Sequence, residues 1–318
     1  MSEAHAMPGH DLGPQLLPSL EAACTGNLHD IHLFRTDWQR GGAATAHARW
    51  RENGAERDVV IKLPVGPVEY RFHTALAKTD APVPRLVASG TELGGYDFAW
   101  VIMEKLPGNP LGAKVNKKVF MEICDAVGRF YAHAERAYPI GSVTPTEWET
   151  ILEKARQATH DNPIPHAQQW SNAIKKTQKA LPNLLLTWRA RPINAWCHGD
   201  LHPANALRRE EGSPWGEPGC VLIDFAEVKP GHWVEDAVYL ERLHWGRPEV
   251  LKGVKTTSLI AKARKNNGLE NGDGYAELGN IRRVMLASCV PAFLHREGSP
   301  SYLEGALGVL EKLLPIVT

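Results

Sequence analysis

An acid and an amide lie five residues apart near the middle of the chain, in the run His198-Gly199-Asp200-Leu201-His202-Pro203-Ala204-Asn205. Gly199 and Pro203 favour a fixed loop over a helix there. A second acid, Asp224, directly follows the apolar run 221–223, and a carboxylate at the end of a buried strand is costly unless something pairs with it. Because Mg²⁺ takes carboxylate, amide and phosphate oxygens as ligands, these side chains are suited to a reaction on phosphate groups.

The transfer of a phosphoryl group needs few parts from a protein. A carboxylate orients the attacking hydroxyl and accepts its proton, oxygen ligands hold Mg²⁺ on the phosphates, and a cation steadies the phosphates from the other side. Asp200 fits the first role, Asn205 and Asp224 fit the second, and Lys62, within the β-branched run 58–63, fits the third. The Asp-x-x-x-x-Asn spacing matches the catalytic-loop pattern of kinases.

These residues also have a structural interpretation. Asp200 and Asn205 are residue types that stabilise turns, and lysines such as Lys62 are common at strand ends. We favour the chemical interpretation because Lys62, Asp200, Asn205 and Asp224 follow one another in the order that a phosphoryl-transfer site requires.

The elements that must position these side chains are predicted to be mainly strands in the first third of the chain and mainly helices after it. Alternation and β-branched residues predict a hairpin from strands 46–51 and 58–63, since Asn53-Gly54 between them tolerates positive φ. A helix over 68–77 and strands over 85–89 and 98–106 then complete a small sheet with one helix packed on it. After 107–110, apolar spacing predicts helices at 119–137, 147–159, 168–181, 275–293 and 302–314, with one strand at 221–223.

The catalytic run 198–205 resembles the catalytic loop of the aminoglycoside phosphotransferase and choline kinase superfamily. The run 221–225, followed by Gly231 and Glu235-Asp236-Ala237, looks like that family's metal-binding strand and the acidic helix start after it. Residues 103–108 are similar to its hinge. The resemblance extends from about residue 38 to residue 245, in the family's order throughout.

This resemblance implies an α+β, protein-kinase-like fold with two lobes. Residues 1–28 are then an N-terminal lead-in with a short helix near 16–23. Residues 29–107 form a small N-lobe with an antiparallel sheet and a helix, and residues 108–318 form a large, mainly helical C-lobe. ATP or GTP is expected in the cleft, with Mg²⁺ as the metal.

The resemblance also assigns roles to single residues. Lys62 and Glu69 look like the family's lysine–glutamate ion pair on the phosphates. The residues expected around the nucleotide are Gly41 and Gly42 in the turn over the phosphates, and Glu104 and Leu106 at the base. Asp236 is expected to accept hydrogen bonds from the catalytic loop and so to have a structural role.

The two histidines of the loop are supporting residues. His198 is either a reactive base or a residue that orients the loop by hydrogen bonds, and we expect the second. His202 either faces the substrate or is packed. Of the many tryptophans, most are expected in the core, and Trp233 and Trp245 are the candidates nearest to the active loops for a substrate pocket.

The composition excludes several classes of protein. Lys plus Arg and Asp plus Glu both number 36, so no global basic field favours nucleic acid, and Lys175-Lys176 and Arg208-Arg209 are expected to be solvated. Five scattered cysteines without a C-x-x-C pair argue against disulfides and zinc. The sequence offers neither a secretory signal nor an apolar segment of about 20 residues. We therefore expect a cytoplasmic monomer or homodimer that binds no membrane.

The expected function is that of a small-molecule kinase, which transfers the γ-phosphate to a hydroxyl of a sugar, an amino sugar, an aminoglycoside or a similar metabolite. Acidic and basic residues balance in the C-terminal third, so the sequence does not require a polycationic acceptor. The alternative is a kinase-fold protein that binds its ligands without turnover. Retention of Lys62, Asp200, Asn205 and Asp224 together argues against that alternative.

Overall fold

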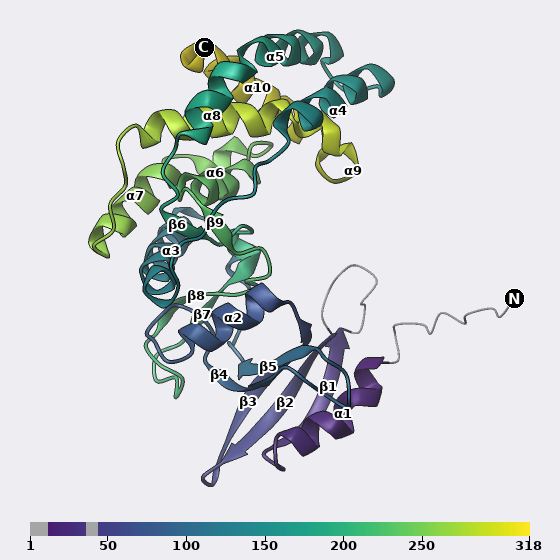
Figure 1. Cartoon of the computed structure of the whole chain (residues 1–318), viewed down its shortest axis with the longest axis vertical. Coiled ribbons are helices and arrows are strands. Elements are labelled where there is room, and N and C mark those ends of the chain that lie inside the picture. Colours follow the sequence, from purple (N-terminus) through teal and green to yellow (C-terminus); the bar gives the residue numbers. More distant parts are fainter. Residues whose placement is uncertain (1–11, 36–43) are drawn as a thin grey trace, which may run out of the picture. The chain divides into compact units, whose positions relative to one another are not determined.

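A computed structural model describes residues 12–35 and 44–318 (Figure 1). Gly41 and Gly42 lie outside the described residues. The chain forms two compact units. Unit 1 consists of residues 1–108 and 207–227, and unit 2 consists of residues 109–206 and 228–318.

Unit 1 contains a five-stranded antiparallel sheet in the order β1-β2-β3-β5-β4. Its strands are β1 (Leu28–Arg35), β2 (Ala44–Glu52), β3 (Ala55–Val65), β4 (Leu86–Gly90) and β5 (Ala99–Glu104). The hairpin of β2 and β3 is confirmed, and its turn residues Asn53 and Gly54 have φ of 51° and 76°. β1 was not predicted, because its alternating histidines and apolar residues give a weak strand signal.

The two faces of this sheet are covered by different helices. α1 (Leu12–Ala23) packs Leu16 and Leu20 on the face that carries Ile61 and Ile102. On the opposite face, Val60 and Val101 pack with Tyr70 of α2 (Pro67–Leu76). Because successive strand residues point to opposite faces, Lys62 lies on the same face as Val60, where α2 packs.

A second small ribbon belongs to unit 1 although it comes late in the sequence. β7 (Ala206–Arg209) pairs with β8 (Gly219–Leu222), as Figure 1 shows. The Leu222 N–H donates to the Pro82 carbonyl at 2.8 Å, and Arg209 forms a buried ion pair with Glu104. Residues 207–227 therefore pack with the sheet, whereas the sequence had placed them in one lobe with the rest of 108–318.

Unit 2 is mainly helical. Its α-helices are α3 (Lys117–Ala137), α4 (Trp148–Asp161), α5 (Ala167–Arg189), α6 (Val234–Arg242), α7 (Thr256–Asn266), α8 (Tyr275–Ser288), α9 (Leu294–Glu297) and α10 (Pro300–Val317). Its 3₁₀ turns are η1 (Leu111–Lys114), η2 (Pro203–Asn205), η3 (Pro248–Leu251) and η4 (Val290–Phe293). The helix predicted over 275–293 ends at Ser288, because Pro291 lacks an N–H and disfavours a continued α-helix, and the chain forms the 3₁₀ turn η4 there instead.

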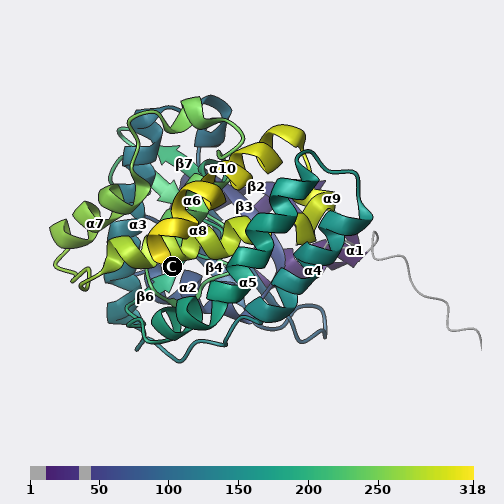
Figure 2. The ribbon, with the colours of Figure 1, turned by 90° about the horizontal axis from the view of Figure 1, so that it is seen from above.

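The helices of unit 2 pack on one another, and a short ribbon beside α3 leads into the run 198–205. α8 lies between α6 and α10, and α4 and α5 pack beside it (Figure 2). The ribbon pairs β6 (Ala195–Cys197) with β9 (Lys229–Gly231) and contacts α3. α7, which is rich in Lys and Arg, was not predicted, and of α6 only the acidic start at 235–237 was expected, from the family resemblance.

All five cysteines are buried, and none of them is joined in a disulfide in the described structure. Among the described residues, no helix combines the length and the apolar character needed to span a membrane.

Candidate active site

Asp200 lies in the loop that leads from β6 to η2 in unit 2. Three side chains hold its carboxylate. The Tyr239 hydroxyl donates to Oδ1 at 2.5 Å, Asn205 Nδ2 donates to Oδ2 at 2.9 Å, and His202 Nε2 lies 3.3 Å from Oδ2. The side chain is thus oriented by groups from both its own loop and α6.

These contacts set the charge of Asp200. The hydrogen bond from His202 holds the pKa of the carboxyl well below its usual range, and the bonds from Tyr239 and Asn205 act in the same direction. Burial opposes them and is outweighed. Burial, with the bond to Asp200, raises the pKa of Tyr239 to about 12, so this hydroxyl stays a donor. Asp200 is therefore an ionised carboxylate over the whole physiological pH range.

The loop backbone is held by a buried acid in the first turn of α6. Asp236 accepts hydrogen bonds from the His198 N–H at 2.7 Å, from the Gly199 N–H at 3.0 Å and from the Tyr131 hydroxyl at 2.7 Å. Burial raises the pKa of Asp236 and its three donors offset that shift only in part. Asp236 shapes the loop and does not face solvent, as expected from its hydrogen-bonding role.

The two loop histidines lie in different environments. The His198 side chain is fully buried, and its main chain binds Asp236, so it sits where it can orient the loop. Gly199 follows with φ of 82°, a conformation that favours glycine. His202 accepts a hydrogen bond at Nδ1 from the Ala204 N–H, which assigns the proton to Nε2, the atom facing Asp200.

In unit 1, Lys62 joins two carboxylates. Its Nζ donates to both oxygens of Glu69, at 2.6 and 2.8 Å, and to Asp224 Oδ1 at 3.0 Å. Burial acts to lower the pKa of Lys62, but the two carboxylates outweigh it and the pKa is raised. The short spacing from Lys62 to Glu69 is possible because α2 begins two residues after β3 and packs on the face that carries Lys62.

Asp224 follows β8 in a strained conformation. Its φ is 65°, in the left-handed region that few residues other than glycine adopt, and its side chain is 46% exposed. A non-glycine residue held there is typical of functional sites. Lys62 thus holds one oxygen of the Asp224 carboxylate, while the side chain stays accessible to solvent.

Glu104 and Leu106, the hinge residues expected near the nucleotide base, are buried inside unit 1. The Glu104 carboxylate is buried and accepts from Arg209 Nε at 2.7 Å, from Arg209 Nη2 at 2.6 Å and from the Arg85 N–H at 3.1 Å. Leu106 is also buried. Arg209 was expected to be solvated, and that prediction is wrong because its guanidinium neutralises Glu104 in the interior of unit 1.

The donor set expected for Mg²⁺ fits the metal in kind. Asn205 uses its Nδ2 for Asp200, which leaves its amide oxygen available, and Asp224 uses only Oδ1 for Lys62. Mg²⁺ commonly takes one or two protein oxygens and fills the rest of its shell with phosphates and water. Within the described part of the chain, no group of three or more His, Cys, Asp or Glu side chains offers an all-protein metal site.

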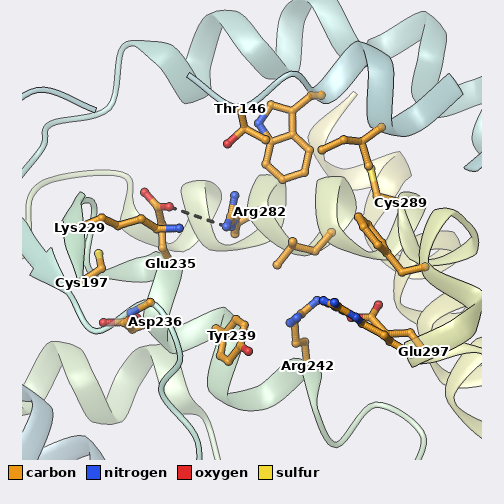
Figure 3. Close-up of a pocket in the computed structure, with 16 residues that line it drawn as sticks. Thr146, Cys197, Lys229, Glu235, Asp236, Tyr239, Arg242, Arg282, Cys289 and Glu297 are labelled. Carbon is orange, nitrogen blue, oxygen red and sulfur yellow. Dashed lines mark hydrogen bonds and ion pairs between the residues drawn. The ribbon is translucent and has the colours of Figure 1, made fainter. Parts of the chain in front are cut away.

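A cavity of about 320 Å³ in unit 2 adjoins the catalytic loop. Gly199, Asp236 and Tyr239 line it together with Trp148 and Arg242. Figure 3 shows Lys229, Glu235 and Arg282 in one row and Asp236, Tyr239 and Arg242 in another. Trp233 is fully buried in the core and Trp245 does not line this cavity, whereas Trp148 does.

Tyr239 is the functional residue that sequence reasoning missed. It lies three residues after Asp236 on α6, so both side chains share a face of that helix. Arg242 follows three residues later on the same face and stacks over the Tyr239 ring at 4.6 Å. The spacing of 236, 239 and 242 was the available signal, but the family resemblance was applied only to the start of this helix, at 235–237.

Comparisons with known proteins identify a family and a fold. The model of the phosphotransferase enzyme family matches residues 14–267. No curated protein matches the chain. Among solved structures, an aminoglycoside phosphotransferase from Alicyclobacillus acidocaldarius is similar at a TM-score of 0.56 and 14% identity, over 99% of this chain and 95% of that one.

Two kinases named for other substrates have the same fold. A microcompartment-associated aminopropanol kinase gives a TM-score of 0.55 at 14% identity, covering 95% of each chain. Choline kinase from Cryptosporidium parvum gives 0.51 at 11% identity, covering 95% of this chain and 92% of that one. At such identities the likeness shows the fold alone, and the fold is the protein-kinase-like one that the sequence predicted.

Proposed function

Because the chain belongs to the phosphotransferase enzyme family, we propose that it is a kinase that transfers the γ-phosphate of ATP or GTP to a hydroxyl group of a small molecule. The observation that carries this proposal is the environment of Asp200. Its carboxylate is ionised and anchored by Tyr239, Asn205 and His202, and its neighbours Gly199 and Tyr239 line a cavity large enough for a small metabolite.

Asp200 orients the acceptor hydroxyl and takes its proton. A carboxylate with a lowered pKa is a weak base, which suits a loose transition state in which the hydroxyl proton leaves late. The new bond joins the acceptor oxygen to the γ-phosphorus. The bond from that phosphorus to the bridging oxygen breaks, and the nucleoside diphosphate leaves with the electron pair.

Lys62 is the cation for the nucleotide phosphates. Glu69, which is buried, keeps the ammonium in place, and Asp224 approaches the same nitrogen from β8. Since the Glu104 side chain is committed to Arg209, we assign the contact with the nucleotide base to the main chain of residues 104–106. The expected role of Gly41 and Gly42 over the phosphates remains part of this proposal.

Asn205 and Asp224 would hold Mg²⁺ through their side-chain oxygens. Bound there, the metal would neutralise phosphate charge as the γ-phosphoryl group transfers. Most of the rate enhancement is then expected from positioning and from fixed charges, since Asp200 and Lys62 are both held by hydrogen bonds before substrate arrives.

A coupled assay of ATP or GTP consumption over a panel of hydroxylated metabolites tests the proposal, with Asp200→Asn as control. The carboxamide keeps the side-chain shape but cannot accept the proton, so turnover should fall by about 10²–10⁴-fold while Mg-ATP binding persists. Near-normal turnover of Asp200→Asn would remove Asp200 from its role. Binding of Mg-ATP without any transfer would instead identify a non-catalytic kinase-fold protein.

A further inference from the structure

The charged side chains that line the cavity next to the catalytic loop differ in whether they already have a hydrogen-bond or ion-pair partner. Its acids are Glu235, Asp236 and Glu297, and its bases are Lys229, Arg242, Arg282 and Arg296. Whether such a cavity attracts a cation or an anion depends on which of these groups are still free to bind a ligand.

Every carboxylate of the cavity is already engaged. Asp236 accepts from Tyr131 and from two N–H groups of the catalytic loop. Glu297 accepts from Arg242 Nη1 at 3.1 Å. No acid of the cavity is thus left without an internal partner to bind an ammonium group.

Glu235 is shared between two buried arginines. It accepts from Arg191 Nη2 at 3.0 Å and from the His232 N–H at 3.1 Å, and Arg282 lies 3.7 Å away. Burial lowers the pKa of Arg282, and its Nε has no hydrogen-bond partner among the described residues. One carboxylate facing two guanidinium groups leaves an excess of positive charge at this wall.

Two further cations of the cavity have no partner. The side chains of Lys229, in β9, and Arg296, in α9, are exposed, and neither forms a side-chain hydrogen bond or an ion pair with the residues that the structure describes. Lys229 and Arg282 also line the adjoining cavity, which adds Arg189 and Arg191. Arg189 pairs with Glu149 and Arg191 with Glu235, so the positive charge that the two cavities share is that of Lys229 and Arg282.

Building on the function proposed above, we propose that the acceptor is a small hydroxylated compound that carries an anionic group, a carboxylate or a phosphate, and not a polycation. The hydroxyl lies at Asp200, and the anion is bound by Lys229 and Arg296 with Arg282 behind them. Hydrogen bonds to charged groups contribute more than neutral ones, so two such cations discriminate strongly between an anionic and a cationic acceptor.

Four compounds of one carbon framework test this inference as acceptors and as ligands. D-gluconate carries a carboxylate, D-glucose 6-phosphate a phosphate, D-glucose no charge and D-glucosamine an ammonium group. Phosphoryl transfer is measured for each, and binding of each is measured by calorimetry. We expect kcat/KM or affinity for one of the anions to exceed that for D-glucosamine at least about tenfold, and the better anion identifies the group recognised.

The variant Lys229→Gln/Arg296→Gln isolates the two cations, and Lys175→Gln/Lys176→Gln is its matched control. The control removes the same charge from the exposed side of α5. The first variant should raise KM or Kd for the anion about tenfold or more and leave KM for ATP unchanged, whereas the control should change neither.

The outcomes separate this inference from the proposed function. Transfer to D-glucosamine or D-glucose at equal or better kcat/KM overturns the anionic acceptor and leaves the kinase activity standing. Anion binding that depends on Lys229 and Arg296, without any transfer, supports the anion site and counts against the kinase. Equal binding of all four compounds, or anion binding unchanged in the variant, overturns the anion site.

Discussion

The Tyr239 hydroxyl donates a hydrogen bond of 2.5 Å to Oδ1 of Asp200, and so links α6 to the catalytic loop. The same helix holds the loop backbone through Asp236, one turn earlier. A single short helix thus orients both the main chain and the carboxylate that the proposed reaction depends on.

Replacing Tyr239 by Phe tests this link. The ring remains to stack under Arg242, but Asp200 loses one of its donors. We expect kcat to fall about tenfold, because loss of one hydrogen bond to a charged group costs about 1.5–3 kcal/mol and part of it is recovered by water. KM for ATP should not change. Steady-state kinetics that show an unaltered kcat would mean that the Tyr239 bond is not needed for turnover.

Replacing Lys62 by Met should weaken the binding of ATP. The ammonium that we propose as the cation for the phosphates is lost, and Glu69 is left buried without its cation. We expect KM for ATP to rise at least about tenfold, with a lower kcat. Titration with a fluorescent ATP analogue measures the affinity directly. Lys175→Met on α5 serves as the control, and equal affinity in both variants would contradict the assignment of Lys62.

The buried pair of Arg209 and Glu104 makes a prediction about stability. Arg209→Met leaves the Glu104 carboxylate buried without its cation, and breaking a buried pair in this way costs about 3–5 kcal/mol. The double variant Arg209→Met/Glu104→Leu removes both charges and should recover most of that loss. Urea unfolding of the three proteins measures the difference, and a double variant no more stable than the single one would refute this explanation.

The pH dependence of stability should contain a contribution from His232. Burial lowers the pKa of His232 to about 4, and its Nδ1 accepts a hydrogen bond from the Val234 N–H, which only the neutral ring can do. Because the folded-state pKa lies below the unfolded value of about 6.5, this stability is present above pH 6.5. It is lost as the pH falls towards 4, by up to about 3 kcal/mol.

His232→Asn is the matching variant, since the Asn side-chain oxygen can accept from the Val234 N–H without titrating. Unfolding midpoints between pH 4 and pH 7.5 should fall less steeply with acid for this variant than for the parent. Other acids with lowered pKa, Glu69 and Asp200 among them, remain in both proteins, so the difference between the two slopes isolates His232. Identical slopes would rule out this contribution.

Much of the fold could be predicted because its signals are local. The hairpin of β2 and β3 follows from alternation on either side of Asn53-Gly54, and α3 and α10 follow from apolar residues at helical spacing. β1 was missed, and α6 was expected only at its start and only from the family resemblance, since a short element with mixed polarity carries little periodicity. The place of residues 207–227 depends on Arg209 and Leu222 meeting residues more than 100 positions earlier, which no local pattern records.

The sequence by itself determined the type of chemistry, because Asp200, Asn205, Asp224 and Lys62 are the residue types and the order that phosphoryl transfer needs. Only the tertiary structure decided how these groups are held and charged. The pKa of Asp200 depends on Tyr239, 39 positions away, and the free charge of the cavity depends on which acids its arginines have already neutralised. Such effects act over a few ångströms, through contacts between segments that are far apart in the sequence. The amino-acid composition therefore does not reveal them.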